Sequence, residues 1–172
     1  VIISHEKDST QRLFERFTFM LTHCAYPGLK YEITKSGAVF PDTESSIWIG
    51  TAGSRSFGRG DDITHAHLSE SAFYESLSIL TSVGEALVND AYLVLDSTAN
   101  GAGTPSHDLW LRAQRGENNY RPHFFGWNED KSLIVHGAKP TELDGYERKA
   151  KEAFNLSWEQ LEWRRQKRRD MA

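Results

Sequence analysis

Apolar residues follow two different spacings along this chain. In some segments they form short continuous runs, which are typical of buried strands, and in others they recur every three or four positions, which predicts helices with one apolar side. Because the two kinds of segment alternate, the sequence predicts an α/β fold with a mainly parallel sheet flanked by helices. The runs predict strands over residues 1–4, 46–51, 63–68 and 91–95, and the recurring pattern predicts helices over residues 8–21 and 71–87.

Weaker signals fill in the remaining segments. A glycine-containing turn at residues 35–37 predicts a hairpin between two short strands, and Pro105 predicts the start of a short helix. From about Thr141 the pattern is helical, with Ser157 as a candidate N-cap. The sequence shows no internal repeat and no clear linker. The hairpin strands are expected at residues 29–33 and 38–40, and a further strand at residues 121–127.

Two of the predicted strands end in polar clusters. Ser69 and Glu70 follow the run 63–68, and the turn 96–101 follows the run 91–95. Ligands of open α/β sheets collect beyond the carboxyl ends of parallel strands. We therefore expect the carboxylate of Glu70 and the polar turn after the next strand to face the same small molecule.

Each cluster has an ordinary interpretation when it is taken alone. Glu70 could orient or deprotonate a water that attacks a phosphate, but it could also begin the next helix, where a negative charge is favoured. The turn 96–101 offers hydroxyl, amide and backbone groups that can sense a terminal phosphate, but it could also be a plain strand exit with local hydrogen bonds. The occurrence of both clusters on neighbouring strands favours a phosphate site.

Two other patterns carry less weight. His65 and His67 alternate onto one face of a strand and, even with Asp61 and Asp62 nearby, lack two well-spaced partners for zinc. The glycine-rich segment 53–60 has the spacing of a phosphate-binding loop, but Arg59-Gly60 stands where Lys-Ser or Lys-Thr is required. Its arginines, Arg55 and Arg59, could instead present a cation to a phosphate on the same or a neighbouring subunit.

Composition narrows the classes of binding partner and the cellular compartment that are expected for this chain. The 172 residues carry a formal net charge of -4, so the chain as a whole has no basic footprint for nucleic acid. The basic run 163–169 is typical of a solvated helix end, with a DNA contact as the alternative. Cys24 is the single cysteine, which excludes an internal disulfide and indicates a reducing compartment. No apolar stretch reaches the roughly 18 to 20 residues of a membrane span, so we expect a cytosolic protein.

The ordered set of motifs resembles the ATPase domain of phage terminase large subunits, the motors that pump DNA into viral capsids. The resemblance covers essentially the whole chain, and it ends in residues 156–165, which are similar to the helical segment leading toward the family's nuclease domain. It is carried by Gly58-Arg59-Gly60, His67-Leu68-Ser69-Glu70-Ser71-Ala72-Phe73, Ser97-Thr98-Ala99-Asn100-Gly101, Trp110 and Phe124-Phe125-Gly126-Trp127.

The resemblance implies a partial P-loop NTPase core of the ASCE (RecA-like) type. Residues 1–155 would form a partial ATPase domain, and residues 156–172 a helical segment before a nuclease domain. It also implies roles for single residues. Glu70 would be the catalytic glutamate at the Walker B position, Arg59 an arginine finger, and Ser69 a ligand of Mg²⁺ directly or through water. Ser97-Thr98-Ala99 would be the coupling motif, and Ser97, Thr98 and Asn100 would contact ATP.

A complete parent would hydrolyse ATP with Mg²⁺ and move double-stranded DNA. Its expected partners are the portal protein, the small terminase subunit and further copies of itself in a ring, and its expected place is the host bacterial cytoplasm at the procapsid portal.

The chain also departs from the family. Ser69 stands where many members carry Asp, no Walker A lysine loop is present, and no nuclease carboxylates follow Ala172. The chain starts inside a predicted strand without methionine, so we expect a fragment that is inactive alone. Two alternatives remain open. One is another P-loop ATPase acting on nucleic acid, such as a helicase or a chromosome-partition enzyme, and the other is a degenerate prophage remnant without activity.

Overall fold

The computed structural model describes residues 1–24, 26–53 and 62–170. It divides into two compact units, residues 1–121 and residues 122–172. The division expected from the sequence, between residues 155 and 156, falls inside the second unit. Each unit is described by itself below.

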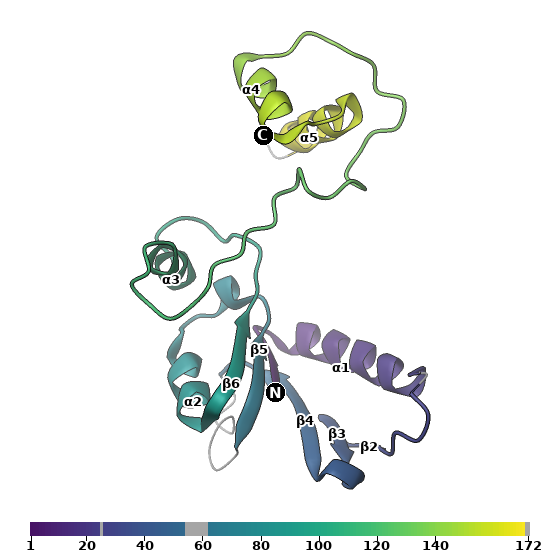
Figure 1. Cartoon of the computed structure of the whole chain (residues 1–172), viewed down its shortest axis with the longest axis vertical. Helices are drawn as coiled ribbons and strands as arrows, with labels where there is room; N and C mark the ends of the chain where they lie inside the picture. The colour runs from purple at the N-terminus through teal and green to yellow at the C-terminus, as the bar shows by residue number, and fades with distance from the viewer. Residues whose placement is uncertain (25, 54–61, 171–172) are drawn as a thin grey trace. The chain divides into compact units, whose positions relative to one another are not determined.

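The first unit is built on a six-stranded mixed sheet with the strand order β2-β3-β4-β1-β5-β6 (Figure 1). The neighbours β4-β1, β1-β5 and β5-β6 are parallel, whereas β2, β3 and β4 pair antiparallel. The expectation of a mostly parallel α/β sheet flanked by helices is therefore confirmed. The strands are β1 (Ile2–Ser4), β2 (Glu32–Ile33), β3 (Gly37–Phe40), β4 (Ser45–Thr51), β5 (Ile63–Leu68) and β6 (Leu87–Leu95).

Helices cover the sheet from both faces. The unit contains α1 (Lys7–Thr22), α2 (Ser78–Ala86) and α3 (Pro105–Gln114), with 3₁₀ turns at Pro41–Thr43 and Ser71–Phe73. The apolar core lies between α2 and the sheet and consists of Ile3, Ile63, Ala66, Leu68, Tyr74, Ile79, Val83 and Ala86.

The strand register assigns α1 and α2 to opposite faces. Ile3 belongs to the cluster that includes Val83 of α2. The next residue, Ser4, points to the other face because side chains alternate along a strand. Ser4 pairs in register with Thr51 of β4, whose hydroxyl oxygen lies 2.8 Å from that of Thr10 in the first turn of α1.

The hairpin of β2 and β3 depends on Gly37. Gly37 pairs with Trp48 across the sheet, and a Cβ at this position would overlap the backbone carbonyl of Ile47. Glycine is therefore needed for the close approach of β3 to β4. The hairpin expected from the sequence is present, with a shorter first strand.

One predicted element is only partly correct, and another is wrong. The helix expected over residues 71–87 is a 3₁₀ turn followed by α2, and Leu87 already belongs to β6. The buried Tyr74 explains the break, because its hydroxyl donates a 2.9 Å hydrogen bond to the carbonyl of Ile3 and its backbone is extended. The strand expected at residues 121–127 is irregular chain, since Pro122 lacks an N–H for a ladder and the aromatic residues Phe124 and Phe125 are exposed.

The second unit contains a pair of helices, α4 (Gly145–Phe154) and α5 (Trp158–Asp170). Asp144 caps α4 in a capping box with Glu147. Ser157 caps α5, as expected, because its hydroxyl accepts a 3.1 Å hydrogen bond from the backbone N–H of Gln160. The core of this unit consists of Ala150, Leu156 and Leu161 with Trp127, Leu143 and Trp158 around them.

Within the described ranges, none of the helices combines the length and the apolar character that crossing a membrane would require.

Candidate functional site

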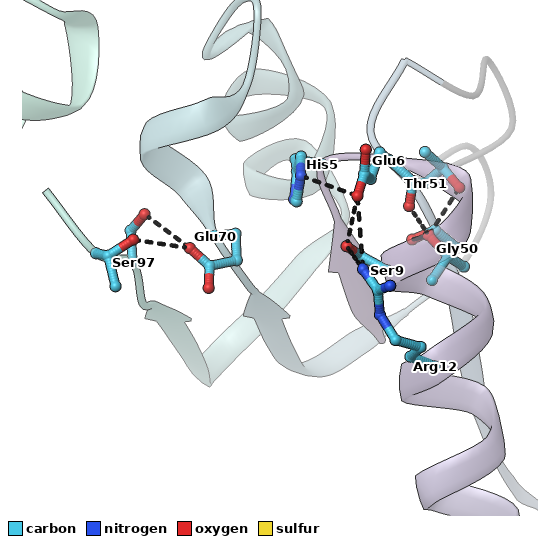
Figure 2. Close-up of polar contacts among 10 residues, drawn as sticks. His5, Glu6, Ser9, Arg12, Gly50, Thr51, Glu70 and Ser97 are labelled. Carbon is cyan, nitrogen blue, oxygen red and sulfur yellow. Dashed lines mark hydrogen bonds and ion pairs between the residues drawn. The ribbon is translucent and has the colours of Figure 1, made fainter. Parts of the chain in front are cut away.

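The candidate site lies at the carboxyl edge of the parallel strands. β1, β4, β5 and β6 run in the same direction, so Ser4, Thr51, Ser69 and Asp96 all follow or end strands at one edge of the sheet. Figure 2 shows polar side chains at the ends of these strands. This is the edge at which open α/β sheets bind ligands.

Glu70 faces the turn that follows β6. The hydroxyls of Ser97 and Thr98 lie 3.4 Å and 3.5 Å from the carboxylate oxygen Oε2 of Glu70 (Figure 2). The juxtaposition expected from the sequence is therefore present in the structure. Both hydroxyls are exposed and Glu70 is half-buried, so the oxygen atoms of the three residues remain open to a ligand.

The backbone of Glu70 is held in an unusual conformation. Its φ is 56°, in the left-handed region that residues other than glycine seldom adopt. Such a conformation costs on the order of 1–3 kcal/mol and persists only where the surroundings enforce it. Glu70 also directly precedes the 3₁₀ turn Ser71–Phe73 at its N-cap position, without a side-chain capping hydrogen bond, so the ordinary interpretation of its position holds for this one short turn.

Hydrogen bonds from the segment after β6 enforce this conformation. The backbone N–H of Ser71 donates to the carbonyl of Asp96 at 2.9 Å, and that of Ala72 donates to the hydroxyl of Ser97 at 3.1 Å. The side-chain amide of Asn100 donates to the carbonyl of Ala72 at 3.1 Å, and the hydroxyl of Ser106 donates to the backbone carbonyl of Ser71 at 2.9 Å. The turn that carries Glu70 and the turn predicted to sense phosphate are therefore one connected unit.

Asn100 tests this connection. We expect Asn100→Ala to lower the free energy of unfolding by about 1 kcal/mol, the usual net value of one hydrogen bond. Urea unfolding followed by circular dichroism measures the change. Asn89→Ala is the matched control, because Asn89 is exposed and no side-chain hydrogen bond is seen for it in the described part of the chain. Equal effects of the two substitutions would contradict the role given to Asn100.

Ser69 sits between the ends of β1 and β5. Its backbone N–H donates to the carbonyl of Ile3 at 2.8 Å, and its side chain is half-buried. Over the residues that the structure describes, no group of three or more His, Cys, Asp or Glu side chains is arranged to hold a metal ion. The role of Ser69 toward Mg²⁺ remains a prediction.

The two histidines of β5 are engaged with β6. The Nε2 atom of His67 contacts Oδ1 of Asp96, and the ring of His65 stacks on that of Tyr92 with 5.3 Å between centroids. The carboxylate of Asp96 is therefore occupied by His67 beside the site.

Burial fixes the protonation of a nearby tyrosine. Desolvation, with a smaller contribution from Asp96, raises the pKa of Tyr74 above its usual value of 10.0. Its hydroxyl therefore stays protonated and keeps donating to the carbonyl of Ile3 at the end of β1.

Sequence reasoning missed the polar residues at the end of β1. The Oγ atom of Ser4 and the Nδ1 atom of His5 are buried and have no hydrogen-bond partner among the described residues. The carboxylate of Glu6 accepts a 3.0 Å hydrogen bond from Ser9 and lies 3.6 Å from Arg12 (Figure 2). The signal was available, because the run 1–3 ends in Ser-His-Glu just as the later runs end in polar clusters.

Arg59, expected as an arginine finger, lies outside the described residues, as do Arg55 and Asp61. The structure therefore brings together Glu70, Ser97 and Thr98, with Asn100 tying the two turns and Ser69 next to Glu70.

Comparison with known proteins adds no family assignment. No protein-family model matches the chain, and no curated protein matches it either. The chemistry of the site is therefore argued from its own residues and geometry.

Proposed function

We propose that this chain is part of an ATP-hydrolysing motor of the kind found in phage terminase large subunits, with a P-loop NTPase core. The observation that carries the proposal is the pairing of Glu70, after β5, with Ser97 and Thr98, after β6, at the carboxyl edge of a mostly parallel sheet. The order of motifs along the sequence supports the choice of this family, and the strained turn supports a functional role for Glu70.

In this proposal Glu70 accepts the proton of a water that attacks the terminal phosphate of ATP. A carboxylate that is half-buried and accepts only long hydrogen bonds keeps lone pairs for that water. The hydroxyls of Ser97 and Thr98 would contact the terminal phosphate or the water, and Ser69 would contact Mg²⁺ directly or through water. Hydroxyl and carboxylate oxygens suit this hard cation, so the donor set fits it.

The hydrogen bonds between the two turns suggest how hydrolysis would lead to movement. The hydroxyl of Ser97 lies next to Glu70 and also accepts a hydrogen bond from the backbone N–H of Ala72. The hydroxyl of Ser106, in the first turn of α3, donates a hydrogen bond to the backbone carbonyl of Ser71. A change in contacts at the phosphate would therefore pass to α3. In the complete motor this shift would serve to move double-stranded DNA through the portal.

Arg59 completes the proposal from sequence alone. It would place a cation on the phosphate held by an adjacent subunit of a ring, because an arginine can stabilise the charge of a transferring phosphoryl group. The portal protein and the small terminase subunit remain proposed partners of the complete protein.

The experiment is ATP hydrolysis by a longer protein that contains this chain, with its flanking coding sequence read on both sides. A lysine-bearing phosphate loop upstream, a nuclease downstream and Mg²⁺-dependent hydrolysis that supports DNA packaging would bear out the proposal. A helicase or partition domain in place of the nuclease would favour the other class of ATPase. An interrupted upstream frame without hydrolysis would indicate a remnant.

The 172-residue chain made by itself is expected to bind ATP weakly or not at all. The reason is that it contains no lysine-bearing phosphate loop, which supplies most phosphate contacts in this class of enzyme. Isothermal titration with ATP and Mg²⁺ measures the affinity. Micromolar binding with steady hydrolysis would contradict this prediction.

A further inference from the structure

The cations of α5 are sorted onto two sides of the helix. Arg165 and Arg169 lie on the side of Glu162, because they follow it by three and seven residues, and they form ion pairs with it at 3.7 Å and 3.0 Å. Arg164 and Arg168, four residues apart, share a different side. The basic residues that follow one another in the sequence therefore lie on two different sides of α5.

α4 extends the second side. Tyr146 and Lys149 are three residues apart and share one side of α4. The guanidinium of Arg164 lies 4.3 Å from the ring centroid of Tyr146, which joins the sides of the two helices. We call this surface the Tyr146 side, and it consists of Tyr146, Lys149, Arg164, Lys167 and Arg168.

The acidic residues of the helix pair mostly neutralise the other side. Glu147 is buried and binds Arg165, and Glu162 binds both Arg165 and Arg169. On the Tyr146 side, neither Lys149 nor Arg168 has a carboxylate partner within the described part of the chain. Lys167 is 3.8 Å from Asp170, but both side chains are exposed, so this pair contributes little.

The negative net charge of the whole chain does not reveal this positively charged surface. Residues 1–121 contain 10 Lys and Arg against 15 Asp and Glu, whereas residues 122–172 contain 10 against nine. The formal net charge of -4 therefore comes from the first unit. The net charge of the second unit therefore favours binding of a long polyanion more than that of the first unit, and within it the side with unpaired cations favours such binding most.

A favourable interaction with the helix dipole explains only part of the pattern. Cations near the carboxyl end of a helix are stabilised by about 0.3–1 kcal/mol, which accounts for basic residues in the last turn of α5. It does not account for Lys149 in α4, nor for the pairing of Glu147 and Glu162 with Arg165 and Arg169 on the opposite side.

We propose that the Tyr146 side binds the phosphate backbone of double-stranded DNA without reading its sequence. Lysine and arginine that are exposed and unpaired are the groups that contact phosphates. Arg164 covers the ring of Tyr146, so the ring is not free to stack on an unpaired base, which favours a duplex over a single strand. The choice of DNA among polyanions rests on the proposed function.

The test uses the full 172-residue chain and a short fluorescent DNA duplex of arbitrary sequence, with affinity measured by anisotropy between roughly 50 and 200 mM salt. The test variant is Lys149→Ala with Arg168→Ala. The matched control is Arg148→Ala with Arg169→Ala, which removes the same charge one residue away on the same two helices but from the other side. Circular dichroism checks that both variants fold, which their exposed positions favour.

We expect the test variant to bind about tenfold more weakly and to lower the slope of log K against log salt by about 2, because two phosphate contacts are lost. The control should change the affinity by less than about twofold. Equal weakening by both variants, or competition by polyglutamate as effective as that by unlabelled duplex, would overturn the proposal.

The result is independent of ATP hydrolysis. The binding measurement needs no nucleotide, so side-dependent DNA binding in a protein that does not hydrolyse ATP would overturn only the ATPase proposal. Hydrolysis and packaging by a complete protein whose DNA affinity does not depend on the Tyr146 side would overturn only this one.

Discussion

Glu70→Gln is expected to slow ATP hydrolysis by about two to four orders of magnitude in a longer protein that joins this chain to a phosphate-binding loop. Glutamine keeps the size of glutamate and an oxygen that can accept from Ser97 and Thr98, but it cannot take a proton from water. Nucleotide binding should therefore remain nearly unchanged. Single-turnover hydrolysis and nucleotide titration measure the two effects separately.

Two further variants separate chemistry from structure. Glu75→Gln changes an exposed acid five residues away and should leave hydrolysis near the parent rate. Glu70→Gly removes the carboxylate but suits the left-handed backbone at this position, so hydrolysis should be lost without loss of stability. Hydrolysis near the parent rate in Glu70→Gln would show that the assignment of Glu70 is wrong.

Arg165→Met is expected to lower the free energy of unfolding by about 3 kcal/mol or more. Arg165 donates two hydrogen bonds of 2.7 Å to the carboxylate of Glu147, which is 4% exposed, and the substitution would leave that charge buried without a partner. Urea unfolding of the whole chain, followed by tryptophan fluorescence, measures the loss. Arg169→Met removes an exposed ion pair instead and should cost about 0–1 kcal/mol.

The same pair makes stability depend on pH. The hydrogen bond from Arg165 lowers the pKa of Glu147 from its usual 4.5 to about 2. The stabilisation is therefore complete above about pH 4.5 and is lost as the pH falls toward 2, with a total of about 3 kcal/mol for this group. Glu147→Leu combined with Arg165→Met should recover much of the stability and remove this part of the pH dependence. An unchanged acid response in the double variant would contradict the assignment.

The sequence predicted the parts of the fold that depend on local pattern. Continuous apolar runs gave β4, β5 and the end of β6, and the polar residues after them identified the edge at which Glu70 meets Ser97. Both predictions need only the alternation of strands and helices and the common direction of parallel strands.

The predictions failed where contacts distant in sequence decide the backbone. The apolar spacing of Phe73 and Leu77 fits a helix, but the hydrogen bond from Tyr74 to Ile3, 71 residues away, holds the chain extended there. The aromatic run at residues 124–125 has the composition of a strand but does not belong to the described six-stranded sheet. Ser4 and His5 were passed over because β1 contributes only three residues.

Backbone groups of Ser71 and Ala72 form four hydrogen bonds with the segment after β6, and these bonds couple the two turns. No bond in the set joins neighbours in sequence, so loosening one turn exposes backbone groups of the other, and partial opening leaves donors unsatisfied. We therefore expect the segment 70–74 and the segment 96–106 to open as one cooperative unit.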